Sequence, residues 1–342
     1  METIIRAATA LSPQQTFGRT SFPGELKDAT GDRLRCAEPD YRNYIDPSLI
    51  RRMSRIIKMG VATARESLRE AGIGIPDAIV TGTAYGCLSD TVQFLTRIIE
   101  QKEAMLSPTA FIQSTHNTVG GQIALMLRCH GYNNTFVHRG LSFESALLDA
   151  TLLLEETDGT VFNVLVGSVE EVTDTSHAIL RRFGMYRRYP VAGEGAAFFV
   201  LTNGRRGEDD VKLDAVSTFY KPKGIEEIER RIVAFLAERQ TGMEDIDLVI
   251  TGRDGGKDGD AIYGQLLRSV FRAAVTIPYK HLCGEYPTSA SFALWFAVQI
   301  LRSGTIPTAL GFEETETGRI RRILIYNHYL GIHHSLIMLS AC

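Results

Sequence analysis

The sequence predicts a layered α/β protein, because apolar runs of strand length alternate along the chain with segments of helical periodicity. At 342 residues the chain has room for roughly two domain-sized units, and its second part repeats the plan of its first. The stretch at 201–212 is rich in glycine and charge and is interpreted as a hairpin or a linker. We therefore predict two halves, at 1–202 and 203–342.

The elements of the first half follow from their patterns in order. Apolar residues at helical spacing predict a long helix at 48–73. The next strands and helices alternate as short apolar runs and longer amphipathic ones: strand 77–86, helix 120–131, strand 133–139, helix 141–156 and strand 161–168. The helix at 141–156 is so apolar that we expect it to be buried on most sides.

The second half is predicted by the same reasoning. It contains, in chain order, helix 224–240, strand 247–252, helix 260–271, helix 289–304, and strands 322–329 and 335–341. Such alternation is typical of a sheet covered by helices on both faces.

Composition excludes several classes of function. The net charge of −3 and the pI near 6.3 leave no basic excess for nucleic acid or an anionic membrane. The N-terminus has no sustained apolar region, and no run is long enough for a membrane span, so we expect a cytoplasmic protein with small-molecule or protein partners. The five cysteines are scattered without a CxxC pair, which argues against disulfides and structural zinc.

The segment "GYNNTFVHRGLSFESALLDA" at 131–150 predicts a strand, a tight turn and a buried helix. Many enzymes present a nucleophile at such a turn. Here the residue at the turn is Gly140, which has no side chain.

Five ordered segments resemble the β-ketoacyl-ACP synthases of the thiolase-like superfamily. They are "LSPTAFIQSTHNTVGGQIALMLRCHGYNNT", "VLVGSVEEVT", "VAGEGAAFFVL", "MEDIDLVITG" and "SASFALWFAVQILRSGTIP". The resemblance extends from about residue 45 to 340. It implies the thiolase-like αβαβα fold of two similar halves, of which 1–202 is the ketosynthase N-terminal-like one.

The resemblance also implies a catalytic cysteine and two histidines, and the sequence departs from all three. The cysteine position falls on Gly140. The first histidine position falls on Gly252 when Gly259–Asp260 is used as the anchor, and the second falls on Glu285, five residues after the retained Lys280. We expect a carboxylate at 285 to oppose an enolate rather than stabilise it. The triad is therefore degenerate, and the chain alone is predicted to be catalytically silent.

The resemblance therefore implies a non-condensing subunit similar to the chain-length factors of type II fatty acid or polyketide synthases, of a polyene or aryl-polyene-like kind. Its expected partners are an active ketosynthase, or a second copy of itself, and an acyl carrier protein. Pairing would extend the sheet through strand 133–139. No cofactor is expected on this chain, because the carrier protein brings the phosphopantetheine.

In related chain-length factors the segment before the elbow strand closes the end of the acyl tunnel. Here Gly120 and Gly121 would let backbones approach closely. The predicted tunnel and interface residues are Phe111, Ile112, Thr115, His116 and Phe136. The alternative is that these side chains only pack a helix start against the core.

Two other classes of function stay open. The chain could be an acyltransferase with a relocated nucleophile, for which Cys87 and Ser142 are the candidates, although a serine at a helix start more often caps backbone N–H groups. It could also be a homodimeric acyl-binding scaffold. His281 is expected to be a surface or hydrogen-bonding group, and His333–His334 to belong to a loop without a metal.

Overall fold

Ten strands form one continuous sheet in the computed structural model, which describes residues 2–27, 31–186, 189–204, 210–312 and 318–342. The first five, in chain order, are β1 (Thr3–Leu11), β3 (Ala78–Gly82), β4 (Tyr132–Phe136), β5 (Asn163–Glu170) and β7 (Gly195–Thr202). The other five are β8 (Val211–Tyr220), β9 (Leu248–Thr251), β10 (Thr276–Pro278), β11 (Arg322–Tyr329) and β12 (His333–Ala341). A separate short pair joins β2 (Arg33–Leu34) to β6 (Ala192–Gly193).

The two groups of five strands have the same topology. The order across the sheet is β10-β9-β11-β12-β8-β1-β7-β5-β3-β4, so that each group runs first, fifth, fourth, second, third from the centre outward. The groups meet where Thr3–Ile5 of β1 pairs antiparallel with 211–213 of β8. The sheet therefore repeats one unit twice, and β4 lies at its outer edge.

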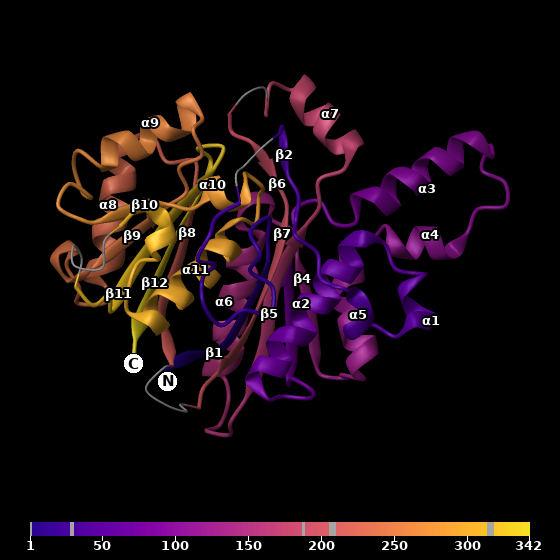
Figure 1. Ribbon diagram of the computed structural model, residues 1–342, viewed down its shortest axis with the longest axis horizontal. Coiled ribbons are helices and arrows are strands. Elements are labelled where there is room, and N and C mark those ends of the chain that lie inside the picture. Colours follow the sequence, from indigo (N-terminus) through magenta and orange to yellow (C-terminus); the bar gives the residue numbers. More distant parts are fainter. Residues whose placement is uncertain (1, 28–30, 187–188, 205–209, 313–317) are drawn as a thin grey trace.

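Helices cover both faces and also fill the middle of the molecule (Figure 1). The central helices are α6 (Ser142–Glu155) and α11 (Ala290–Ser303), and each contacts strands of both halves. Helices α2 (Arg55–Ala71) and α5 (Thr118–Leu127) cover the outer face of the first half, and α8 (Ile225–Ala237) and α9 (Lys257–Leu266) cover that of the second. The expected αβαβα layering is confirmed.

The middle layer is buried because its sequence is apolar on every face. Every residue from Ala290 to Leu301 is buried, including Phe292, Trp295 and Phe296. Truncating one of these rings would cost about 3–5 kcal/mol by loss of transfer energy and creation of a cavity. Helix α6 is less enclosed than predicted, since Leu152 at its far end is 55% exposed.

Several predicted boundaries need correction. The helix expected at 48–73 is two helices, α1 (Pro47–Ile50) and α2, because the chain turns at 51–54 and Ser54 starts α2 in an extended conformation. Segment 201–212 is not a hairpin, since β1 lies between β7 and β8; residues 205–209 lie outside the described part, and the predicted boundary of the halves stays a prediction. His333 and His334 begin strand β12 rather than a loop.

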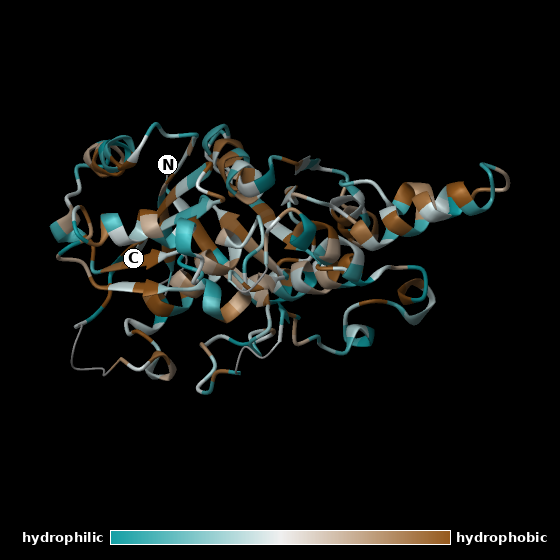
Figure 2. Ribbon diagram, turned by 90° about the horizontal axis from the view of Figure 1, so that it is seen from above, coloured by the Kyte–Doolittle hydropathy of each residue, from teal (hydrophilic) through white to brown (hydrophobic). Residues whose placement is uncertain are grey.

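The remaining helices are α3 (Leu88–Glu100), α4 (Pro108–Gln113), α7 (Asp174–Arg182) and α10 (Lys280–Cys283). Helices α3 and α4 form an arm that projects from the body beside α5 and carries hydrophobic residues on its surface (Figures 1 and 2). Among the described residues, no helix has the length and apolar character needed to cross a membrane.

Candidate functional site

The elbow has the predicted geometry. Strand β4 ends at Phe136, residues Arg139–Leu141 form one 3-10 turn, and α6 begins at Ser142. The turn is tight because Arg139 takes a left-handed conformation with φ of 53°. The Ser142 hydroxyl closes the turn by donating to the carbonyl of Arg139 and accepting from the amide of His138, both at 2.8 Å.

The space beside Gly140 is filled by Tyr329, the last residue of β11. A Cβ built on Gly140 would lie 2.8 Å from Cγ and 2.9 Å from Cδ1 of Tyr329, and closer still to its Cβ. Tyr329 is only 3% exposed, and its hydroxyl is 2.9 Å from the hydroxyl of Tyr85. A side chain at position 140 therefore has no room in this structure unless Tyr329 moves.

Gly252, directly after β9, is also tightly surrounded by side chains. A Cβ there would lie 2.5 Å from the Tyr263 hydroxyl and would overlap the side-chain oxygen of Asn327. Tyr263 is fully buried, and its hydroxyl accepts a hydrogen bond from the amide of His328 at 3.1 Å. Neighbouring side chains thus occupy the volume that an imidazole at 252 would need.

Glu285 forms a buried ion pair with Lys280. Its Oε2 lies 2.5 Å from Nζ of Lys280, which also donates to the carbonyl of His328 at 3.1 Å. Burial raises the pKa of Glu285 to about 8; Lys280 opposes the shift, and Asp254 adds to it by repulsion. Burial and Asp254 therefore favour the protonated form of this carboxyl group, while Lys280 favours the ionised form.

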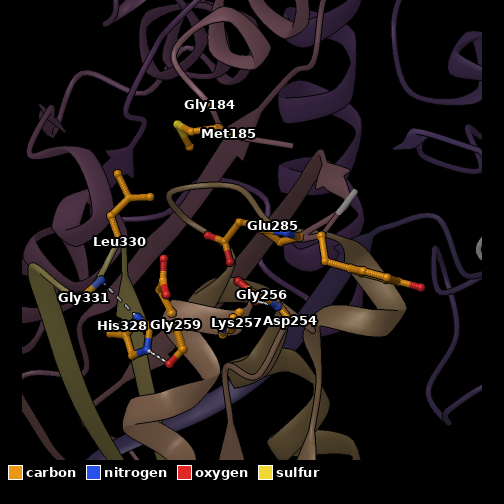
Figure 3. A pocket seen from close by; sticks show the side chains of 13 residues that line it. Gly184, Met185, Asp254, Gly256, Lys257, Gly259, Glu285, His328, Leu330 and Gly331 are labelled. Carbon is orange, nitrogen blue, oxygen red and sulfur yellow. Dashed lines mark hydrogen bonds between the residues drawn. The ribbon is translucent and has the colours of Figure 1, made fainter. Parts of the chain in front are cut away.

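A cavity of about 320 Å³ opens beside Glu285 (Figure 3). Its wall includes Asp254, Lys257, Leu330 and His328. His328 is neutral, since burial lowers its pKa to about 3. Its ring is held in place, because Nε2 lies 3.1 Å from the carbonyl of Gly259 and Nδ1 accepts from the amide of Gly331 at 3.3 Å. This imidazole is therefore fully hydrogen-bonded and gives the cavity no free base.

The alternative nucleophiles are poorly placed. Cys87 is fully buried, and desolvation together with Asp90 and Glu171 raises the pKa of its thiol far above the ordinary value, which disfavours a thiolate. Ser142 is also fully buried, and both of its hydrogen bonds go to backbone atoms of the turn. The geometry therefore favours the capping interpretation of Ser142.

The surroundings of the candidate histidines give no sign of a catalytic or metal-binding role. His281 is exposed beside the buried Lys280, and His334 is buried with Nδ1 2.9 Å from the Tyr326 hydroxyl. No group of three or more His, Cys, Asp or Glu side chains in the described part of the chain is arranged to hold a metal ion.

The predicted wall residues differ in their surroundings. Phe111 and Ile112 on α4 are 56% and 60% exposed, and Phe111 packs against Phe94 of α3. The Thr115 hydroxyl hydrogen-bonds within its own turn, to Ile112, Asn117 and Thr118.

The other residues predicted for this wall, His116 and Phe136, contact the main part of the fold. His116 packs against Gly86 beside the elbow-facing Tyr85, and Phe136 packs against the central core. Gly120 lies close to side chains of β3 and β4, whereas a side chain on Gly121 would meet open space.

Sequence reasoning missed two residues of this site, Tyr329 and Asp254. A signal for the first was present, because Asn327, His328 and Tyr329 end an otherwise apolar strand, and polar groups in a buried strand need a specific reason. The segment around Asp254 is rich in glycine and charge, which is typical of a solvent-exposed turn. In the structure Oδ1 of Asp254 does accept from the amide of Gly256 at 2.8 Å, but its side chain also faces Glu285.

Comparison with known proteins finds similarity to β-ketoacyl synthases in both sequence and structure. Residues 33–188 match the family described as "Beta-ketoacyl synthase, N-terminal domain". No curated protein sequence matches the chain.

Solved structures share the fold over the whole length. "The ishigamide ketosynthase/chain length factor" has a TM-score of 0.79 at 17% identity, covering 100% of this chain and 99% of that one. A ketosynthase in complex with its chain length factor from Xenorhabdus doucetiae has a TM-score of 0.75 at 14% identity, with 100% and 98% covered. A type II polyketide synthase acyl-carrier protein in complex with its ketosynthase has a TM-score of 0.74 at 14% identity, with 100% and 99% covered.

Proposed function

We propose that this chain, which carries a β-ketoacyl synthase N-terminal domain and the fold of that family, is a non-condensing subunit resembling a chain-length factor. The observation that carries the proposal is the packing of Tyr329 against Gly140, which leaves no volume for a nucleophile at the elbow. If position 140 lacked only its side chain, one mutation could restore a nucleophile. Because Tyr329 fills the space, a nucleophile at 140 would require changes at both positions.

The other two positions support the same conclusion. A histidine at Gly252 would overlap Asn327 and Tyr263, and Glu285 forms an ion pair with Lys280. Condensation in this family needs an acylated nucleophile and donors that stabilise an enolate oxyanion. The chain supplies neither at the expected positions. We propose that it contributes surface and shape to a partner, in a polyene-like or related type II pathway.

The free edge of β4 and the surface around it suit a protein partner. Half of the large hydrophobic side chains exposed among the described residues lie between 95 and 152, on or near α3, α4, α5 and β4. They are Leu95, Ile99, Met105, Phe111, Ile112, Leu125, Tyr132, Val137 and Leu152. Exposed apolar side chains beside an unpaired strand are typical of an interface. Related structures are complexes of a ketosynthase with a chain length factor, which makes an active ketosynthase the favoured occupant.

We therefore expect the protein not to be a stable monomer. Light scattering at micromolar concentration should give a dimeric mass, or a heterodimer after addition of a cognate ketosynthase. Leu125→Glu, on a helix that contacts β4, should weaken this association at least tenfold because it places a charge in the apolar surface. Val233→Glu, which is similarly exposed on the distant helix α8, is the matched control. A monomeric mass that does not change with the ketosynthase would contradict the assignment.

The tunnel role of the α4 region is a second expected result. In the heterodimer, Ile112→Trp or Thr115→Trp should shift products to shorter chains while turnover persists, because overpacking the end of a tunnel costs about 1–3 kcal/mol. A penalty of that size changes product ratios by roughly tenfold or more. Thr109→Trp, exposed on the same short helix, is the control. Unchanged product length in both variants, with the heterodimer intact, would remove this wall from the proposal.

An acyl carrier protein is the proposed carrier of the growing chain, since a carrier protein complex is among the related structures. The phosphopantetheine would arrive on that partner, and this chain would hold no cofactor of its own. A homodimeric acyl-binding scaffold is the alternative, and an association test that gives only homodimers would favour it.

A further inference from the structure

The cavity beside Glu285 contains a buried oxygen that lacks a donor. Glu285 is 4% exposed, and neither Oε1 nor Oε2 has a hydrogen-bond partner among the described residues, although Oε2 forms an ion pair with Nζ of Lys280 at 2.5 Å. Figure 3 shows the Glu285 side chain projecting into the cavity near Asp254. Two carboxylates have only acceptor atoms, so Asp254 can satisfy Glu285 only if a proton lies between them. The site therefore needs either a proton or a donor from a ligand.

The charges nearest this oxygen do not balance. Glu285 and Asp254 bring two carboxyl groups, while Lys280, with a side chain only 1% exposed, brings one ammonium group. The other titratable groups that face Glu285 are the thiol of Cys283 and phenols held neutral by burial, those of Tyr85, Tyr186, Tyr263, Tyr279 and Tyr329. His328 is neutral as well. One positive charge is missing from the pair of carboxylates.

The residues that line the cavity indicate which kind of cationic ligand could bind there. Met185, Pro190 and Leu330 give it an apolar side. Exposed residues such as Lys257 and Asp258 mark its opening to solvent. A volume of about 320 Å³ admits a short alkyl chain in addition to a polar head group. We propose that the cavity binds a primary ammonium group on a short alkyl chain, with the N–H donors directed to Oε1 of Glu285 and to Asp254.

A primary ammonium has three donors and one charge, which match the orphaned oxygen and the excess carboxylate. It must compete with the proton that the two carboxyl groups otherwise share. Since the pKa of Glu285 is raised to about 8, the free site holds this proton below that pH and loses it above. Binding should therefore release up to one proton, and affinity should rise with pH by up to tenfold per unit between about pH 6 and 8.

The test uses the purified full-length chain and n-butylammonium chloride, followed by calorimetry in buffers of different ionisation enthalpy. We expect saturable binding at millimolar concentration, with proton release and the pH dependence given above. n-Butanol carries the same alkyl chain without the charge and should bind at least tenfold more weakly. Binding of n-butanol or potassium chloride as tight as that of n-butylammonium would overturn the proposal.

Asp254→Asn is the informative variant, because it removes one negative charge and leaves the Lys280–Glu285 pair and the amide contact of Gly256 in place. It should weaken n-butylammonium at least tenfold and abolish the proton release. Asp258→Asn makes the same charge change at an exposed position of the cavity mouth and should change affinity less than threefold. Equal effects of the two variants, or a folded Asp254→Asn protein that binds normally, would contradict the proposed contacts.

Discussion

Replacing Gly140 by cysteine is expected to lower the melting temperature by about 1–4 °C and to create no condensing activity. The new Cβ would overlap Tyr329, which cannot easily move aside. Its backbone pairs with His333 at the end of the β11–β12 ladder, and its ring is buried. Overpacking of a rigid core typically costs about 1–3 kcal/mol, and more where the neighbour is backbone-anchored.

The control for this variant is Gly264→Cys, where a Cβ would meet nothing closer than Arg268 at 3.8 Å. Its melting temperature should stay close to that of the original protein. In a double-mutant cycle, Tyr329→Gly removes Cβ together with the ring and should relieve the clash, so that Gly140→Cys costs at least ~1 kcal/mol less in the Tyr329→Gly background. If Gly140→Cys is as stable as the control, Tyr329 does not fill the elbow. Robust condensation by the single variant would mean that the histidine positions are wrongly assigned.

Replacing Gly252 by histidine should be more damaging, at ~3 kcal/mol or more, and should leave most of the protein insoluble or unfolded. The clash involves the side chains of Asn327 and Tyr263, both buried. Moving Tyr263 would also break its hydrogen bond with the amide of His328. Urea unfolding and the soluble fraction after expression are the measurements.

Gly74→His is the matched control, because a Cβ on that glycine meets nothing within 4 Å. Adding Asn327→Ala and Tyr263→Phe to Gly252→His should recover part of the stability, since the first creates volume and the second removes the hydroxyl. Stable, soluble Gly252→His protein would show that the second half can still accommodate the imidazole.

The fold was predictable because local patterns and layer rules agree. The wholly apolar segment at 289–304 has to be buried, and it forms the buried central helix α11. The break at 51–54 was not predictable, because apolar spacing continues through it, and only the backbone shows that α2 starts anew after Ser54. The strand at 333–334 was missed because resemblance suggested a loop there, whereas the ladder with Tyr329 and His328 places both histidines in β12.

The assignment of the triad positions stays a prediction, and the residues that surround these positions could not be predicted. Gly140, Gly252 and Glu285 could be located from motifs along the chain. What fills the vacated volume comes from remote residues, Tyr329 beside Gly140 and Asn327 beside Gly252, and no local pattern connects them. The raised pKa of Glu285 likewise depends on burial and on Asp254, which is distant in sequence.

The central claim, that this chain contributes no condensation chemistry, is tested most directly with its heterodimer. The chain is incubated alone, and in complex with a cognate ketosynthase whose catalytic cysteine and both catalytic histidines are replaced by alanine, with acyl and malonyl carrier protein. Intact mass spectrometry and carbon dioxide release are then measured. We predict no acyl adduct on this chain and no decarboxylation above the protein-free control. An adduct, or carbon dioxide release that persists in the Cys87→Ala/Ser142→Ala variant, would contradict the account.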